Sequence, residues 1–241
     1  MDEPRAPDEP LARRSVTRNA LGIGLASGAY ALSFGALSVA AGLSVLQTCV
    51  LSLVMFTGAS QFALIGVVGA GGNPFSGAAT AILLGLRNGL YGLRMSPILR
   101  VRGLRRLGAA QWVIDETTAM AITQPTEPLS RLAFYSTGLA LYVLWNLGTL
   151  IGALAGQAIS NPADLGLDAA VPAAFLALLA PRMEGREQWV VAITAAAVAL
   201  VSVPFVPQGV PVLLAAAVGV AFGLRPGGGT VTAEPSLREP A

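Results

Sequence analysis

The chain has 241 residues, of which 54% are hydrophobic and 12% are charged, and its mean hydropathy is +0.66. Soluble domains carry about 25% charged residues, so this composition excludes an ordinary soluble domain. The formal net charge is +2, and every basic residue is an arginine. Because the arginines stand in short clusters beside apolar segments, they are typical of orientation signals in membrane proteins and do not indicate nucleic-acid binding.

The inventory of reactive side chains excludes several classes of function. The sequence has no histidine and one cysteine, Cys49, so neither a disulfide within the chain nor an ordinary metal site is expected. It contains no nucleophile elbow, phosphate-binding loop or zinc-protease motif. We therefore expect neither an enzyme nor a bound cofactor.

The first part of the chain predicts three apolar segments. Residues 1–19 are polar, and we expect them to form a cytoplasmic segment. The apolar run that follows is longer than the h-region of a signal peptide, which indicates an uncleaved helix. No charged residue stands between Arg18 and Arg87, and this stretch has room for three crossings of about 20 residues each. The predicted segments are Ala20–Leu43, Val45–Gly71 and Phe75–Leu99.

After a polar stretch, the second part predicts four more apolar segments and a disordered cytoplasmic tail over residues 225–241. The whole chain is then an all-α, polytopic membrane helix bundle. Its transmembrane domain spans residues 20–224 and holds about six or seven apolar segments. The segments of the second part are Leu132–Ile159, Ala169–Pro181, Trp189–Val203 and Val210–Leu224.

The arginines predict the orientation of the chain. Arginines in short loops mark the cytoplasmic side of a membrane protein, which places both termini and the middle loop in the cytoplasm. The four segments of the second part agree with this placement. The three segments of the first part do not, because an odd number of crossings cannot return the chain to the same side. We therefore expect at least one of them to be broken or re-entrant. The arginines concerned are Arg13, Arg14, Arg18, Arg100, Arg102, Arg105, Arg106, Arg131, Arg182, Arg186 and Arg225.

The segment Val45–Gly71 is the best candidate for the irregular one. Its centre reads Thr57-Gly58-Ala59-Ser60-Gln61, where small residues and an amide favour a break in the helix. Broken backbone at membrane depth is tolerated where protein or a watery cavity satisfies it, and in transporters such breaks form the substrate site. The alternative is that the small residues permit close helix packing and that Gln61 bonds a neighbouring helix.

Two arginines lie inside the third segment. Arg87 and Arg94 are seven residues apart and so share roughly one helix face. A charged group inside a span marks a pathway or a partner by default. Arg94 is near enough to the end of the segment to reach the membrane surface. Arg87 lies deeper, and its guanidinium suits a carboxylate, which belongs either to a substrate or to Asp115 or Glu116.

These two acids stand between apolar flanks in Ala109–Met120. Burial favours the protonated form of a carboxylate, so Asp115 and Glu116 are candidate proton carriers for ion coupling. The alternative is an interfacial helix whose acids lie in water or pair with the cluster Arg100–Arg106.

Small residues repeat every four positions in several segments, and such stripes indicate close helix packing in lipid. They comprise Gly24 with Gly28; Gly148, Gly152 and Gly156; and Ala215, Gly219 and Gly223.

Several motifs resemble those of one family, in the same order along the chain. Phe56–Phe62 resembles the FxGASQF signature of the AzlC family, the large subunit of branched-chain amino-acid exporters. Arg87–Gly92 resembles the family's N-x-R-H/Y-x-L-Y-G/S segment, and Ile114–Thr117 resembles its T-D-E-T/S segment. Together the matches extend over roughly residues 15–224. The match to the family's G-L-D…F…P stretch consists of Leu167, Asp168, Phe175 and Pro181.

The resemblance implies a permease that exports branched-chain amino acids, or in some members methionine, together with a small AzlD-type membrane subunit. Gly85 stands where the family usually has Asn, Asn88 takes the His or Tyr place, and Ile114 replaces Thr, which puts the substrate specificity in doubt. On the matching positions, the substrate-binding candidates are Thr57, Gly58, Ala59, Ser60, Gln61, Arg87, Asn88 and Tyr91.

The leading hypothesis is a multi-pass protein of the cell inner membrane that exports small apolar amino acids and is driven by an ion gradient. The sequence has no nucleotide-binding motif, so an ATP-driven mechanism would need another subunit. The expected partners are the lipid bilayer, the amino-acid substrate, the small subunit and further copies of the chain in a homo-oligomer. Two alternatives stay open: a passive channel for a small solute, and a membrane assembly subunit without transport activity.

Overall fold

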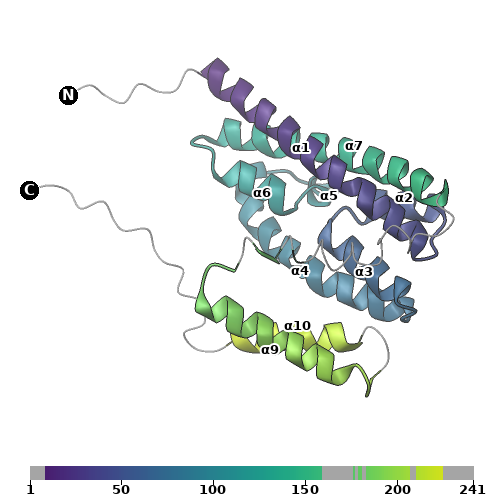
Figure 1. Cartoon of the computed structure of the whole chain (residues 1–241). Coiled ribbons are helices and arrows are strands. Elements are labelled where there is room, and N and C mark those ends of the chain that lie inside the picture. The colour runs from purple at the N-terminus through teal and green to yellow at the C-terminus, as the bar shows by residue number, and fades with distance from the viewer. Residues whose placement is uncertain (1–8, 159–175, 177–178, 181–182, 207–209, 225–241) are drawn as a thin grey trace, which may run out of the picture. The chain divides into compact units, whose positions relative to one another are not determined.

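A computed structural model describes residues 9–158, 176, 179–180, 183–206 and 210–224. Every regular element in these ranges is a helix (Figure 1). The chain divides into two compact units, Met1–Leu176 and Ala177–Ala241. The predicted all-α class is therefore confirmed. Most of the predicted segment Ala169–Pro181 lies outside the described residues, which include only 176 and 179–180 of it. The motif residues Leu167, Asp168, Phe175 and Pro181 and the tail from residue 225 lie outside them as well.

The helices follow the predicted segments closely. In the first unit they are α1 (Glu9–Ala40), α2 (Val45–Val54), α3 (Ala59–Gly69), α4 (Pro74–Leu99), α5 (Leu104–Gln111), α6 (Asp115–Ile122) and α7 (Glu127–Ala158). In the second unit α9 (Arg186–Ser202) packs against α10 (Val210–Gly223). Two helices, α1 and α7, are long and apolar enough to cross a membrane by length and composition.

The structure differs from the sequence predictions at two places. Helix α1 begins at Glu9, eleven residues before the predicted start at Ala20. Pro10 is tolerated in a first helical turn, and Glu9 suits the positive end of the helix dipole, so the polar stretch continues the apolar helix. The other difference is the pair α5 and α6. Each has only 8 residues, which is too short for a hydrophobic period to stand out in a polar stretch.

Helices α1 and α7 lie side by side and run in the same direction (Figure 1). A Cβ placed on Gly24 would lie 3.0 Å from the Cβ of Ala140, near the start of the contact. A Cβ placed on Gly156 would lie 2.9 Å from the Cα of Ala36, near its end. Small residues thus allow the two backbones to touch, which confirms the packing role predicted for the glycine stripe of α7.

Helices α2 and α3 form a fold-back between α1 and α4. From the turn after α1, the chain returns along α7 until the ring of Phe56 contacts that of Tyr142, with centroids 5.0 Å apart. Helix α3 then runs beside α1 in the opposite direction to α2. Phe62 packs on Phe34 at 5.4 Å, and Gly69 reaches Ala41, just after the end of α1. Residues 45–69 therefore reverse direction in the middle of the unit and do not form one continuous helix.

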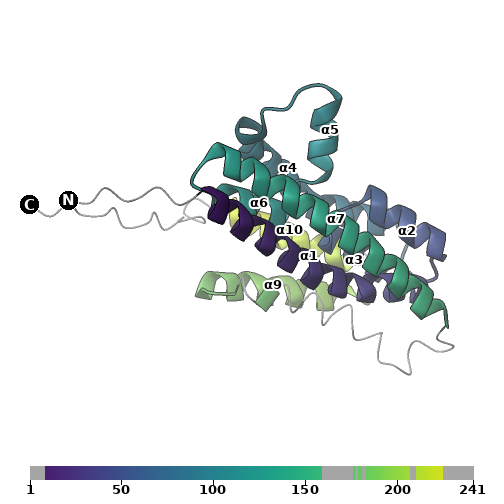
Figure 2. The ribbon, with the colours of Figure 1, turned by 90° about the horizontal axis from the view of Figure 1, so that it is seen from above.

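A second, shorter fold-back consists of α5 and α6, beside α4 (Figure 2). After Arg100, at the end of α4, α5 leads the chain back until Trp112 covers Gly138 of α7, where a Cβ would lie 2.8 Å from the indole. Helix α6 begins there and packs along α7. The two fold-backs meet, because the side chain of Gln111 binds backbone carbonyls at the end of α2.

Candidate substrate site at the helix break

The predicted break between α2 and α3 is confirmed. Helix α2 ends at Val54 and α3 begins at Ala59, so the interruption covers residues 55–58. Gly58 has φ 60° and ψ −94°, a backbone conformation that glycine adopts readily and other residues rarely do. Ser60 and Gln61 belong to the first turn of α3, slightly beyond the break itself.

The carbonyl end of α2 is satisfied by side chains from two other segments. The backbone oxygen of Leu53 accepts from the hydroxyl of Tyr142 at 3.1 Å and from Nε2 of Gln111 at 3.0 Å. The same Nε2 donates to the oxygen of Val54 at 3.0 Å. The last carbonyls of a helix have no partner within the helix, so these two side chains satisfy them and hold the break in place.

The amino end of α3 is held differently. Oε1 of Gln61 accepts from the backbone N–H of Gly58 at 3.1 Å, while the oxygen of Gly58 accepts from the N–H of Gln61 at 3.0 Å. Gly58, at the N-cap position, has no side chain that could accept from the N–H groups of the first turn of α3. A helix N-terminus of this kind presents N–H groups and a partial positive charge, which together favour an anion.

Buried polar atoms collect around the break. Ser60 is 1% exposed and Gln61 is fully buried, yet the Ser60 hydroxyl and the Gln61 Nε2 have no hydrogen-bond partner among the described residues. The same holds for Thr57 Oγ1, Tyr30 OH and Trp145 Nε1. Most buried polar groups in proteins are hydrogen-bonded, so a group of atoms without protein partners marks a place for a polar solute or water.

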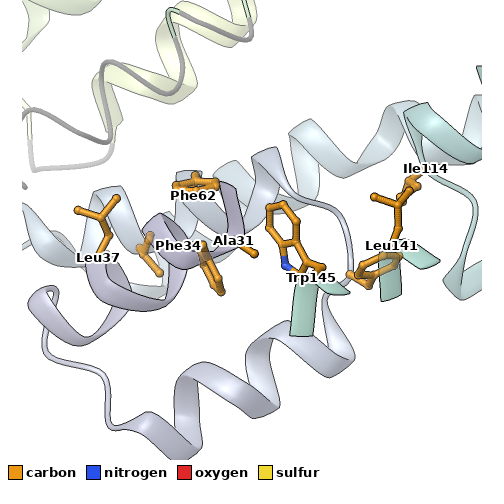
Figure 3. Close-up of a cluster of buried hydrophobic side chains, with 9 residues drawn as sticks. Ala31, Phe34, Leu37, Phe62, Ile114, Leu141 and Trp145 are labelled. Carbon is orange, nitrogen blue, oxygen red and sulfur yellow. The ribbon is translucent and has the colours of Figure 1, made fainter. Parts of the chain in front are cut away.

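Aromatic rings enclose these polar atoms. The ring of Tyr30 lies 5.0 Å from that of Phe62 and 6.1 Å from that of Trp145, measured between centroids. Figure 3 shows Phe34, Phe62 and Trp145 gathered from three helices in one apolar cluster. The edge of Trp145 also faces Gly58, whose Cβ position lies 3.9 Å from the indole. The break thus combines polar groups with an apolar wall.

Arg87 pairs with Asp115. Their Nη1 and Oδ2 atoms are 2.9 Å apart, and the two side chains are 27% and 22% exposed. Of the two partners left open by the sequence, a substrate or an acid of the chain, the structure shows the acid Asp115. The fold-back of α5 and α6 places Asp115 beside Arg87. Thr117 stabilises the start of α6, because its hydroxyl accepts from the N–H of Ile114 at 3.1 Å and donates to the oxygen of Trp112 at 2.6 Å.

The remaining predicted residues lie around these two centres. Asn88, next to Arg87, has a buried Oδ1 without a hydrogen-bond partner in the described ranges. Tyr91 packs against an apolar cluster at the end of α4, while Arg94 and Glu116 are exposed. Ala59 is the first residue of α3 and is half-buried.

Helix α4 connects the two centres. It runs against α3, and the Cβ position of Gly85 lies 3.7 Å from the Ser60 hydroxyl. The break and the Arg87–Asp115 pair therefore both contact the middle of α4.

Sequence reasoning missed Tyr30, Trp145, Gln111 and Tyr142. Tyr30 and Trp145 stand in long apolar helices, where an aromatic residue is usually an ordinary core residue. For Trp145 a signal was available, because Trp145 and Asn146 together place polar groups in the middle of an apolar segment. No local pattern indicates the role of Gln111 and Tyr142, because each binds carbonyls that are far away in the sequence.

Comparison with known proteins agrees with this reading of the motifs. A family model described as AzlC protein matches residues 22–159, more than half of the chain. An uncharacterized membrane protein of Archaeoglobus fulgidus is 31% identical over 158 residues, which are 65% of this chain and 69% of that protein. The inner membrane protein YgaZ of Escherichia coli K12 is 29% identical over 169 residues, 65% of this chain and 67% of that protein. No solved structure gives a significant match. The chain is a membrane protein and belongs to the AzlC family.

Proposed function

We propose that the chain is the large subunit of a secondary transporter that exports branched-chain or similarly small apolar amino acids. In this proposal an ion gradient drives the export, and a small AzlD-type membrane subunit is required. The observation that carries the proposal is the buried helix break, where unpartnered polar atoms and aromatic rings meet. Membership of the AzlC family, which the sequence motifs link to such exporters, supports the substrate class.

The fold-back accounts for the orientation conflict in the first part of the chain. Helices α2 and α3 have 10 and 11 residues, so each is about 15–17 Å long, roughly half of a hydrocarbon core of about 30 Å. If both half-helices enter and leave on one side, α1 and α4 are the two crossings between the cytoplasmic N-terminus and the cytoplasmic middle loop. The break then lies near the middle of the bilayer, where transporters of several folds bind their substrates.

The break offers a matching environment for each part of an amino-acid zwitterion. The N-terminus of α3 and the Ser60 hydroxyl favour the carboxylate, because the positive end of the helix dipole points there. The C-terminal end of α2 has the opposite polarity and favours the ammonium group. The rings of Phe62 and Trp145 suit an aliphatic side chain. Gln61 positions the break through its bond to Gly58 and offers Nε2 to the solute.

In this proposal the Arg87–Asp115 pair couples transport to an ion gradient. A proton that binds to the carboxylate of Asp115 removes its charge and weakens the attraction to Arg87. The guanidinium is then available for the carboxylate of the substrate, so that loading and protonation are linked. Glu116, the other predicted coupling residue, is the alternative proton carrier on the same turn.

Reconstitution in proteoliposomes tests the function. Vesicles that carry the chain, with and without its small subunit, are loaded with labelled leucine, valine, isoleucine or methionine, and efflux is measured with and without a proton gradient. We expect saturable efflux that needs both subunits and is accelerated by the gradient. Gln61→Ala is expected to lose this activity, while Gln157→Ala, at an exposed position of α7, retains it.

The same assay separates the rivals. A passive channel shows flux that does not saturate and shows no counterflow against unlabelled substrate. An assembly subunit without transport shows equal efflux for the wild type and for Gln61→Ala when both are made at the same level. Either result would overturn the proposal.

A further inference from the structure

A cleft lies between the second half of α4 and the helix α5. Its volume is about 220 Å³, which leaves room for several water molecules. Residues of both helices line it, among them Gly89, Gly92 and Ser96 of α4 and Arg106 and Ala110 of α5. The cleft is partly open, and Arg106 of the cluster Arg100–Arg106 belongs to its lining.

The glycines of α4 that line this cleft pack against no other helix among the described residues of the first unit. A Cβ placed on Gly89 or Gly92 would meet no atom within 4 Å. By contrast, a Cβ on Gly148 or Gly152 of α7 would collide with the backbone of α1. Glycine weakens a helix interior, so its presence at two positions without packing indicates that the open space itself is needed.

The open face of α4 leads to the break. Residues 85, 89, 92 and 96 stand on one face of a helix, because they are spaced by four, three and four positions. The Cβ position of Gly85 lies 3.7 Å from the hydroxyl of Ser60, which is 1% exposed and has no hydrogen-bond partner in the described part of the chain. One end of this face is therefore the candidate substrate site and the other end is the cleft.

The cleft has the charge and the polarity that a small apolar amino acid needs. Met95 and Val113 contribute apolar surface to its lining, and Arg106 contributes a guanidinium. Within the described ranges the structure gives Arg106 no ion-pair partner, whereas Arg100 and Arg131 both bind Glu127. An arginine that is free of internal partners favours a carboxylate from solution.

We propose that this cleft is the access route by which the amino acid passes from the arginine-bearing side of the membrane to the helix break, with Arg106 as the first contact of its carboxylate. The inference rests on the proposed function, because it names the route to the same site. The arginine-bearing side is the expected cytoplasmic side, which is where an exporter loads its substrate.

Cysteine labelling tests the route. In a Cys49→Ser background, Gly89→Cys and Gly92→Cys are exposed to a membrane-impermeant maleimide in vesicles of either orientation. We expect labelling from the arginine-bearing side only, slowed several-fold by leucine. The control is Leu90→Cys, at a position of α4 that is 68% exposed but does not line the cleft, and we expect it to react slowly from both sides. Unlabelled Gly92→Cys, labelling from both sides, or labelling that leucine does not slow would each overturn the proposal.

Efflux measurements separate this inference from the proposed function. Gly92→Leu fills the cleft without meeting a neighbouring atom at its Cβ, and we expect it to lose leucine efflux while its expression and thermal stability stay near those of the wild type. Gly22→Leu, on α1, also has an open Cβ position and is expected to transport normally. Normal efflux by Gly92→Leu would overturn the route and leave the proposed function intact. If the wild-type protein shows no leucine efflux, the proposed function is overturned. The labelling of Gly89→Cys and Gly92→Cys would then still show whether the cleft is open to water from one side.

Discussion

The guanidinium of Arg87, in the middle of α4, lies 2.9 Å from the carboxylate of Asp115, at the first residue of α6. These residues come from segments that hydropathy separates into a membrane helix and a polar loop. The pair exists because α5 leads the chain back from the end of α4, so that a stretch resembling a cytoplasmic loop supplies an acid to a partly buried arginine. The structure therefore gives a specific partner to each of two charged groups that would be costly alone in an apolar environment.

The first prediction concerns the strength of this pair. Arg87→Ala and Asp115→Ala are each expected to lower the stability of the protein in detergent, and the double variant to lose less than the sum of both. We expect an interaction of about 1–2 kcal/mol, less than for a fully buried pair, because both side chains are only partly buried. Chemical unfolding of the four proteins measures it. Additive effects would show that the pair contributes nothing.

The second prediction concerns ion coupling. Asp115→Asn keeps the size of the side chain but cannot carry a proton, so we expect it to retain leucine counterflow and to lose acceleration by a proton gradient. Glu116→Gln is the matched control on the same turn. If only Glu116→Gln loses the acceleration, the coupling role belongs to Glu116, and if neither does, the coupling acid lies elsewhere.

The third prediction concerns the contact between α1 and α7. A Cβ on Gly148 would collide with the carbonyl oxygen of Gly28. Forcing a methyl group into such a close-packed contact costs about 1–3 kcal/mol, so Gly148→Ala is expected to lower the thermal midpoint clearly. Gly22→Ala, on the open face of α1, is the control. It is expected to match or slightly exceed the wild type, because alanine is the better helix former.

The long helices and the break could be predicted from the sequence, whereas their connections could not. Hydropathy locates α4, α7, α9 and α10 to within a few residues, since a crossing helix needs about 20 apolar residues. The break was predictable because Gly58 and its small neighbours weaken a helix, and because the arginines require an even number of crossings. The direction of α2 and α3, and the return of α5 toward Asp115, depend on contacts between distant residues. Tyr30 could not be recognised as a site residue for the same reason.

The fourth prediction concerns Gln111, which stabilises the helix break but is not proposed to bind the solute. Gln111→Ala removes the donor for the carbonyls of Leu53 and Val54, and a helix-end carbonyl that loses its partner in an apolar environment costs about 1–3 kcal/mol. We expect this variant to lower the thermal midpoint of the protein, and any loss of transport to follow the loss of folded protein. Gln157→Ala, exposed on α7, is expected to leave both unchanged. An unaltered midpoint for Gln111→Ala would mean that the end of α2 does not depend on this bond.

Equilibrium binding of labelled leucine to the purified complex tests most directly whether the solute binds at the break. The wild type and Gln157→Ala are expected to bind leucine saturably. In both proteins, unlabelled valine is expected to displace the labelled leucine, whereas glutamate is not. Gln61→Ala is expected to fold and to bind no leucine at the same concentrations, because the solute loses its contact with Nε2 and the turn at Gly58 loses its acceptor. Undiminished leucine binding by a folded Gln61→Ala variant would contradict the account, since the solute would then bind elsewhere in the protein.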